Sequence, residues 1–251
     1  MPSSISDNSS PCVLVAGGSG VIGRAICRSF GQHGWHLGIH YHRNLTSANR
    51  SAHMVQESGA TATILQADCR TFTPVEQMVQ TLIAQSGRLD VVVFSVGIGA
   101  SRLLVQTPSE TWTDLLSVNL TGCFLVLKAV GPILQKQQEG TVIIVGSLSS
   151  LLGSSGQAAY AASKSGLIGL TKTAAREWGP DNIRVNAIFP GWQASPLSGT
   201  AMPDPSHLQA HLQNHVLERT SSPEEIAKAV YQLAQMKGVS GQIWNLDSRI
   251  W

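Results

Sequence analysis

Tyr160 and Lys164 stand four residues apart in the segment GQAAYAASKSG, and this spacing could do chemistry. In a helix, two residues at this spacing project from the same face. An ammonium group close to a phenol favours the phenolate, so it would lower the pKa of the tyrosine from about 10 toward neutrality. Tyr160 could then protonate a carbonyl oxygen. The same spacing is also typical of an exposed helical pair with no chemical role, so other parts of the chain must decide.

A glycine-rich stretch near the N-terminus, VAGGSGVIG, could hold a phosphate group. Read from Gly18, it is the dinucleotide fingerprint Gly18-x-Gly20-x-x-Gly23. Read from Gly17, it is a wider turn that has Val21 where its middle glycine would stand. In both interpretations the glycines allow a tight turn and a close approach of the backbone to a ligand.

The surroundings of this stretch favour nucleotide binding over a merely structural turn. An apolar strand, CVLVA, precedes the glycines, and a helical segment, VIGRAICRSF, follows them. The unpaired N–H groups at the beginning of such a helix can bind a pyrophosphate. A second strand comes next, which is the order of a dinucleotide-binding unit.

The end of that second strand, IHYHRN, indicates which dinucleotide is bound. A site for NADH would be expected to carry an acidic residue here for the ribose diol, and none is present. Arg43, with His42 beside it, instead offers a planar guanidinium that suits a 2′-phosphate. We therefore predict a preference for NADPH, with a solvated surface charge as the alternative role of Arg43.

The scaffold for these residues is predicted by the alternation of short apolar runs with longer helical segments, which is typical of a parallel sheet covered on both faces. We expect an α/β doubly wound fold with about seven parallel strands. The expected strands are CVLVA, HLGIHY, ATILQA, LDVVVFS, GTVIIVGS, IRVNAIF and GQIWNL. The expected helices include residues 21–33, 47–58, 74–86, 109–135 and 158–178.

The 251 residues, 43% of them hydrophobic, suit a single domain. We expect a disordered tail over residues 1–10 and one catalytic domain over residues 11–251. The segment 191–225 is rich in Pro and Ser and follows an expected strand end. Because such insertions often close over ligands, we predict a substrate lid there, with a plain surface loop as the alternative.

Composition excludes several partners and compartments. A net charge of +2 without a run of Lys or Arg argues against nucleic acid. The N-terminus has no signal-peptide pattern, and no stretch approaches the roughly 18 apolar residues of a membrane span, so we expect a soluble protein. The four cysteines are scattered without a C-x-x-C pair, which favours a reduced, cytoplasmic location.

Three histidines recur every four residues in HLQAHLQNH and could share one helical face. Such a face could bind a metal ion, but neither a carboxylate nor a cysteine accompanies His207, His211 and His215. We therefore predict no metal site and expect a polar face of a mobile helix.

The chain as a whole, from Cys12 to the last strand, resembles the short-chain dehydrogenase/reductase family. The resemblance rests on VGSLSSLLG, which places Ser147 thirteen residues before Tyr160, on SVNLTG with Asn119, and on VNAIFPG after the active-site helix. It implies a Rossmann-type fold and a catalytic tetrad of Asn119, Ser147, Tyr160 and Lys164. In that tetrad Ser147 would hydrogen-bond the substrate carbonyl, and Asn119 would hold a water in the proton relay. Lys164 would bind the nicotinamide ribose and tune Tyr160.

The resemblance also implies where the cofactor binds. The family turn is the wider one, with Val21 as a departure, and FSVG stands where the family usually has Asn-Asn-Ala-Gly. Asp68 matches a position beside the adenine ring, and Ser195 replaces a threonine that often contacts the nicotinamide amide. The implied positions for NADPH or NADP+ are Gly17, Ser19, Val21, Ile22, Gly23, His42, Arg43, Asp68, Ser95, Gly97, Tyr160, Lys164, Pro190, Gly191 and Ser195.

The substrate implied by the resemblance is a small-molecule ketone, most like those of the 3-oxoacyl-thioester reductase branch. Reductases that use acyl carrier protein present basic residues at two turns, which here read KQQEG and GPDN. Gln138 and Asp181 would attract an acidic carrier poorly, whereas Lys136 remains. A free ketone, a coenzyme A thioester and a specialised carrier therefore stay open.

Two alternatives remain. Pteridine reductases of the same family also lack the middle glycine and carry a similar HYHR, yet they usually have Asp at the position of Ser147. A regulator that senses NADP(H) without turnover is an alternative of another class. Many relatives are tetramers, so we expect a homo-oligomer, tetramer or dimer, although Leu125, Ala129 and Leu170 could equally pack on the sheet.

Overall fold

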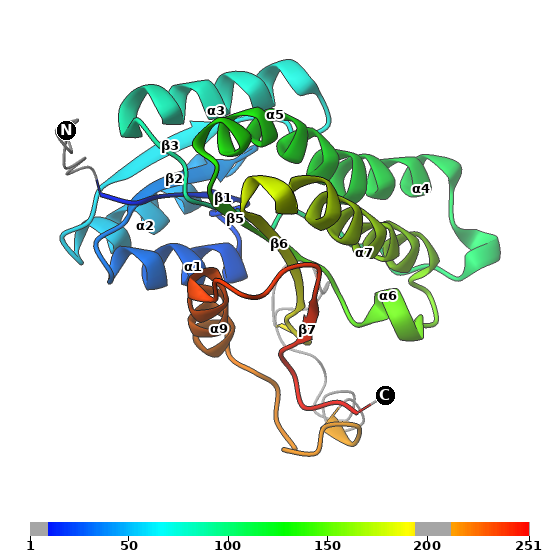
Figure 1. Cartoon of the computed structure of the whole chain (residues 1–251). Coiled ribbons are helices and arrows are strands. Elements are labelled where there is room, and N and C mark those ends of the chain that lie inside the picture. Colours follow the sequence, from blue (N-terminus) through cyan, green and yellow to red (C-terminus); the bar gives the residue numbers. More distant parts are fainter. Residues whose placement is uncertain (1–9, 194–211, 251) are drawn as a thin grey trace, which may run out of the picture.

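A seven-stranded parallel sheet is the framework of the protein in a computed structural model, which describes residues 10–193 and 212–250 (Figure 1). Its strand order is β3-β2-β1-β4-β5-β6-β7. The seven predicted strands and the doubly wound fold are confirmed. The strands are β1 (Cys12–Ala16), β2 (His36–Tyr41), β3 (Ala62–Gln66), β4 (Val91–Phe94), β5 (Gly140–Val145), β6 (Ile183–Phe189) and β7 (Ile243–Asn245).

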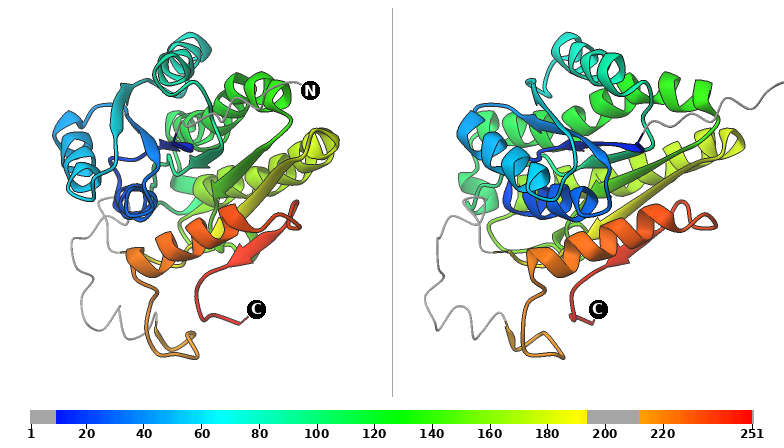
Figure 2. Two further views of the ribbon diagram at one scale, coloured as in Figure 1. Left: turned by 60° about the vertical axis from the view of Figure 1, so that its left-hand side comes forward. Right: turned by 90° about the vertical axis from the view of Figure 1, so that its left-hand side faces the viewer.

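Helices cover both faces of the sheet (Figure 2). One face carries α3 (Phe72–Ser86), α5 (Gly122–Gln137) and α7 (Ala158–Trp178), and the other carries α1 (Val21–Gly31), α2 (Leu45–Gln56) and α9 (Pro223–Gln235). The short α4 (Ser109–Leu116) and α6 (Ser149–Leu152) lie beyond the sheet. Side chains alternate along β1 between the two cores, since Leu14 packs on the first face and Val15 on the second.

Two segments differ from the prediction by more than a shift of two residues at a helix end. The single helix expected over residues 109–135 is α4, a π-helical turn over Ser117–Thr121, and α5. The expected insertion 191–225 overlaps α9, because Ser222 and Glu225 form a capping box that begins this helix at Pro223. Residues 194–211 of the insertion lie outside the described residues.

The continuous helical stretch Ser109–Gln137 has the length and hydropathy of a membrane span, contrary to the expectation that no stretch approaches one. Several of its apolar side chains nevertheless pack within the fold. Cys123, Val126, Val130 and Leu134 are fully buried members of the core on the α3 face. The α5 part of the stretch is therefore a core helix of the sheet, and Ala129 on α5 and Leu170 on α7 are partly buried against the same core.

The sheet topology determines where a ligand can bind. Strand β1 lies between β2 and β4, so the chain crosses over in opposite directions on either side of it. In open α/β sheets such a switch point forms a crevice at the carboxyl ends of the strands. The glycine turn follows β1, Arg43 follows β2, Asp68 follows β3 and Ser147 follows β5. The fold thus brings the predicted site residues to one edge of the sheet.

Candidate active site

The glycine turn after β1 depends on Gly17 and Gly23. Gly17 has φ of +88°, and a Cβ there would stand 2.7 Å from the backbone oxygen of Ser95. A Cβ on Gly23 would stand 2.1 Å from the Gly17 oxygen, whereas one on Gly20 would meet that oxygen at 3.3 Å. The turn therefore follows the wider pattern, and Gly20 is the glycine that its geometry requires least.

The beginning of α1 suits an anionic ligand. Gly20 is its N-cap residue and offers no side-chain cap, and the first turn contains no acidic residue. The N–H groups of a first helical turn have no partner within the helix. Val21 and Ile22 are only partly buried, so this end of the helix is open to a phosphate group.

His40 supports the glycine turn, although nothing in the residues around it singles it out. The Gly17 N–H donates to His40 Nδ1 at 3.0 Å, so the other ring nitrogen carries the proton and donates to the Ala67 oxygen at 3.1 Å. Burial lowers the pKa of His40 to about 4, which keeps the ring neutral. This side chain therefore ties the turn to the end of β3, next to Asp68.

The two predicted adenosine-side residues differ in their surroundings. Asp68 binds Arg70 with both carboxylate oxygens, and His42 Nε2 lies 3.6 Å from Asp68 Oδ2. The hydrogen bonds from Arg70 hold the pKa of Asp68 at about 2. His42 thus faces Asp68, while Arg43 is exposed and has no salt-bridge partner within residues 10–193 and 212–250. Of these residues, Arg43 retains a guanidinium available to a ligand.

Tyr160, Lys164 and Ser147 converge between α7 and the end of β5. Tyr160 and Ser147 form a side-chain hydrogen bond. Lys164 Nζ lies 5.9 Å from the centre of the Tyr160 ring and donates to the Val145 oxygen at 2.9 Å. Lys164 is 4% exposed, and burial lowers its pKa to about 8. The pair therefore lies inside the fold and is not an exposed helical pair.

The expected lowering of the Tyr160 pKa is not found in the chain alone. Burial raises that pKa, and the hydrogen bond with Ser147 opposes the rise without reversing it. The physical reason is the burial of the phenol, while the Lys164 ammonium group is directed to the Val145 backbone oxygen.

Asn119 is fully buried in the π-helical turn and acts as a structural link. Its Oδ1 accepts from the Ile98 N–H at 2.8 Å, and its Nδ2 donates to the Ile98 oxygen and to Ser163 Oγ at 3.0 and 2.9 Å. Ser163 Oγ in turn donates to the Tyr160 backbone oxygen at 2.7 Å. Both amide hydrogens of Asn119 are therefore used to join the loop after β4 to the helix that carries Tyr160.

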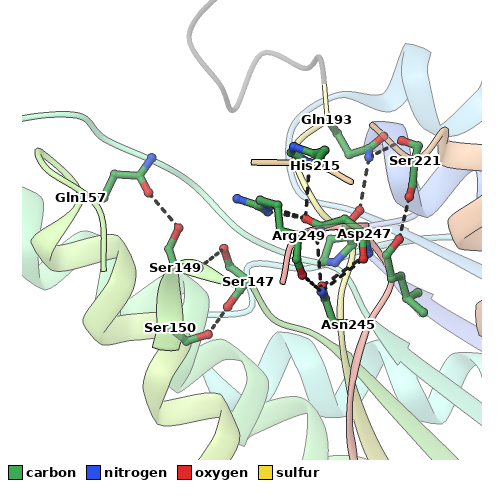
Figure 3. Close-up of polar contacts among 12 residues, drawn as sticks. Ser147, Ser149, Ser150, Gln157, Gln193, His215, Ser221, Asn245, Asp247 and Arg249 are labelled. Carbon is green, nitrogen blue, oxygen red and sulfur yellow. Dashed lines mark hydrogen bonds and ion pairs between the residues drawn. The ribbon is translucent and has the colours of Figure 1, made fainter. Parts of the chain in front are cut away.

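Ser147 begins a chain of polar contacts along α6 (Figure 3). Its Oγ accepts from the Ser149 N–H at 3.2 Å, and Ser149 Oγ donates to Gln157 Oε1 at 3.1 Å. Ser150 Oγ donates to the Ser147 backbone oxygen. These contacts fix the backbone around Ser147, while Ser147 itself stays partly exposed.

The remaining predicted positions lie at the ends of β4 and β6. The Ser95 N–H donates to the Ala16 oxygen at 2.8 Å, and a Cβ on Gly97 would stand 3.4 Å from Lys164 Nζ. Gly191 follows the buried Pro190 and has φ of +75°. Ser195 lies outside the described residues.

The structure describes only one of the three histidines expected on a helical face, and that histidine does not lie on a helix. His207 and His211 lie outside the described residues, whereas His215 forms an isolated antiparallel bridge with Arg249 and is buried. It is withdrawn from solvent because the C-terminal segment, with Asp247, covers it. Within residues 10–193 and 212–250, no group of three or more His, Cys, Asp or Glu residues is placed to hold a metal ion.

Replacing Lys164 by methionine is expected to stabilise the protein at pH 7 by about 1–3 kcal/mol. The folded pKa of about 8 lies below the ordinary 10.5, so the unfolded chain binds more protons between these values. The penalty for the buried charge is complete below pH 8 and disappears as the pH rises to 10.5. Urea unfolding at pH 7 and pH 10 would measure this, with the exposed Lys172→Met as control. An equal gain in the free energy of unfolding at both pH values would contradict a penalty from the buried Lys164 charge.

Comparisons with known proteins agree with this geometry. Residues 16–248 match a sequence model of the Enoyl-(Acyl carrier protein) reductase family. A 3-oxoacyl-[acyl-carrier-protein] reductase from Synechocystis sp. is 33% identical over 237 residues, which cover 93% of this chain and 94% of that protein. One from Thermotoga maritima is 38% identical over 175 residues, or 69% of this chain and 70% of that protein. The crystal structure of a dehydrogenase/reductase from Sinorhizobium meliloti 1021 superimposes with a TM-score of 0.88 at 28% identity, covering 96% of this chain and 95% of that one.

Proposed function

Because the chain belongs to the short-chain dehydrogenase/reductase family, and is therefore an oxidoreductase of the CH–OH/C=O class, we propose that it is an NADPH-dependent reductase of 3-oxoacyl thioesters. The observation that carries this proposal is the convergence of Ser147, Tyr160 and Lys164 at the carboxyl ends of the strands, beside the glycine turn. An acid placed next to a dinucleotide site suits the reduction of a carbonyl group.

The residues present fit a dinucleotide. Gly17 and Gly23 let the turn pack closely against the end of β4 and on itself. The uncapped beginning of α1, which follows the turn, offers N–H donors to a pyrophosphate. The exposed Arg43 suits the 2′-phosphate of NADPH. When bound, NADPH supplies the hydride. Pro190 and Gly191 would contact its nicotinamide half from the end of β6, together with the proposed Ser195.

The side chains of this site would handle the substrate and the proton. Ser147 hydrogen-bonds the carbonyl oxygen, and Tyr160 donates its phenolic proton to that oxygen as the carbonyl becomes an alcohol. Lys164 is still charged at neutral pH, because its pKa is about 8, and it stabilises the phenolate that remains. Asn119 holds the Tyr160 helix in place through Ser163, so a part for Asn119 in a water relay would not use its amide hydrogens.

Replacing Arg43 by alanine is expected to weaken NADPH binding by about tenfold or more and NADH binding by less than about twofold, because only NADPH has a phosphate for charged hydrogen bonds. Fluorescence titration of both nucleotides gives the two Kd values. Arg50→Ala removes another exposed arginine, from α2, and serves as the matched control. An unchanged ratio of the two Kd values would assign the 2′-phosphate to other residues.

The surface where a carrier protein would dock has little positive charge. It supports the proposal that the thioester substrate need not be attached to an acidic carrier protein. The turns before β5 and after α7 lie side by side, since Gln135 and Gln138 both donate to the Asp181 carboxylate, at 2.9 and 3.1 Å. Beside Lys136, this surface presents a carboxylate and neutral amides. An acidic carrier would gain little attraction here.

The test of the proposed function is NADPH oxidation with acetoacetyl-coenzyme A, acetoacetyl-acyl carrier protein, crotonoyl-coenzyme A, a diketone and dihydropterins. We expect turnover with the acetoacetyl thioesters, and comparable rates with both would show that a carrier is not needed. Turnover of the pterin alone would indicate the pteridine reductase alternative, and crotonoyl turnover alone would indicate enoyl reduction. NADPH binding with no turnover of any substrate would favour the regulator.

The setting of this activity is part of the same proposal. We propose a cytoplasmic enzyme, which the four free and buried thiols support, since none is paired in a disulfide. We also propose a homo-oligomer. Phe124 on α5 and Trp112 on α4 are 49% and 40% exposed, and such large apolar side chains are typical of a contact surface. Light scattering would give the oligomeric state.

A further inference from the structure

A buried carboxylate near the C-terminus lies outside the proposed catalytic groups. The Asp247 side chain is 1% exposed and is bound by Arg249 in three ways: its backbone N–H donates to Oδ1 at 2.9 Å, its Nε donates to Oδ2 at 2.7 Å, and its Nη2 forms an ion pair with Oδ2. Asn245 Nδ2 lies 3.3 Å from Oδ1, and His215 Nε2 lies 3.9 Å from Oδ2. A carboxylate so withdrawn from water requires this compensation.

The backbone of Gly191 lies directly against this carboxylate. A Cβ on Gly191 would stand 2.7 Å from Asp247 Cβ and 2.9 Å from Asp247 Oδ2. With φ of +75°, Gly191 holds a conformation that residues with side chains rarely adopt. The position of the Asp247 side chain therefore limits where the chain can run as it leaves β6.

The same loop is braced by a second set of contacts (Figure 3). Gln193 Nε2 donates to the Ser221 oxygen at 2.8 Å, and Ser221 Oγ donates to the Leu246 oxygen at 2.6 Å. The Leu246 N–H returns to the Phe189 oxygen at 2.8 Å. Residues 189–193, 215–221 and 245–249 thus form one interlocked unit at the end of β6, and the C-terminal segment joins its parts (Figure 1).

From this geometry we infer that Asp247 and Arg249 are positioning residues that hold the loop 190–193 in the conformation needed for the nicotinamide half of the cofactor. The inference rests on the proposed function, which assigns Pro190 and Gly191 to that half. The ion pair acts through the backbone of Gly191 and does not touch the reacting atoms. Its effect is therefore on orientation of the nicotinamide, and the adenosine half, at the ends of β2 and β3, lies outside its reach.

The test compares two probes on the full chain: NADPH and 2′-phospho-ADP-ribose, which lacks the nicotinamide. In Arg249→Met we expect the Kd of NADPH to rise by roughly 3- to 30-fold, while the Kd of 2′-phospho-ADP-ribose stays within about twofold of wild type. The conservative Arg249→Lys should recover part of the NADPH affinity, because the charge returns without the fork of donors. Equal losses for both probes, or no loss for either, would overturn the inference.

A matched control exists at the amino end of β4, whereas the loop 190–193 lies at the carboxyl end of β6. Arg88 and Asp90 form the same type of ion pair across two residues, before β4 and away from the loop 190–193. Arg88→Met should leave both Kd values unchanged even where it lowers the melting temperature. If Arg249→Met does not fold, the double variant Asp247→Asn/Arg249→Met removes both buried charges and is measured in its place.

Hydrogen–deuterium exchange gives a readout that needs no ligand. We expect the peptide covering residues 189–193 to exchange faster in Arg249→Met than in wild type, and the peptide covering the glycine turn to be unchanged. The same faster exchange in both peptides would indicate general destabilisation and would contradict the inference. A wild-type protein that binds neither probe would instead count against the proposed NADPH site.

Discussion

Replacing Tyr160 by phenylalanine is expected to lower the turnover of an acetoacetyl thioester by roughly 100- to 10,000-fold, which is the usual contribution of a positioned acid. The Kd of NADPH should remain within about twofold of wild type, because the variant loses only the phenolic oxygen. In the structure this phenolic oxygen forms a hydrogen bond with Ser147, and the Tyr160 ring faces Lys164 Nζ. Steady-state rates and NADPH titration together make the measurement.

The control for this experiment is Tyr231→Phe. Tyr231 packs on α1 through Phe30 and His33, on the other face of the sheet, so the loss of its phenol should leave turnover unchanged. If Tyr160→Phe is as active as wild type, Tyr160 is not the proton donor. If wild-type protein itself binds NADPH and turns over no carbonyl compound, the regulator becomes the better interpretation.

The central strands could be predicted because they are short, apolar runs buried on both sides. VVVF and GTVIIV are buried at every position, and such runs bounded by Gly, Ser or Asp have few other stable settings. Because the carboxyl ends of parallel strands meet at one edge of a sheet, the expected parallel arrangement brings the glycine turn, Arg43 and Ser147 to that edge. The candidate site was thus predictable as far as it depends on strand ends and helical spacing.

The remaining features depend on contacts between residues far apart in sequence. In the sequence, His40 looks like one more residue of a buried strand. Its supporting role depends on hydrogen bonds with Gly17 and Ala67, which lie 23 and 27 positions away. The raised pKa of Tyr160 also needed coordinates, since it comes from burial of the phenol, which outweighs the hydrogen bond with Ser147. Spacing along a helix predicts which side chains are neighbours, but not what each one binds.

The C-terminal segment shows the same limit. Nothing in the residue types or spacing of NLDSRIW predicted a structural role for this segment. The structure gives Arg249 a partner in Asp247 and places the Asp247 side chain against Gly191, 56 positions earlier. Similarly, His215 was grouped with two histidines by helical periodicity, whereas its contact with Arg249 comes from the fold. Periodicity was the wrong guide there because the chain at His215 is not helical.

Replacing Gly23 by alanine is expected to weaken NADPH binding by about 100-fold or more. The added Cβ would stand 2.1 Å from the Gly17 backbone oxygen. No side-chain rearrangement can relieve this distance, because the position of a Cβ is set by its own backbone and the oxygen is a backbone atom. The first turn of α1 must then move away from the glycine turn, and overpacking of this kind costs about 1–3 kcal/mol or more. That free energy is lost where the pyrophosphate would bind, so it reduces affinity directly. NADPH titration measures the effect, and thermal unfolding shows how much of it is general destabilisation.

Gly20→Ala provides the matched control and decides between the two patterns of the turn. Its Cβ would meet the Gly17 oxygen at 3.3 Å, which a shift of a few tenths of an ångström relieves, and Gly20 has an ordinary φ of −77°. We therefore expect Gly20→Ala to change the Kd of NADPH by less than about fivefold, since compatible Gly→Ala changes act mainly on the unfolded chain. If Gly20→Ala abolished binding as fully as Gly23→Ala, the narrower fingerprint from Gly18 would describe the phosphate site. If only Gly23→Ala did so, the wider turn that begins at Gly17 would be the one that holds the cofactor.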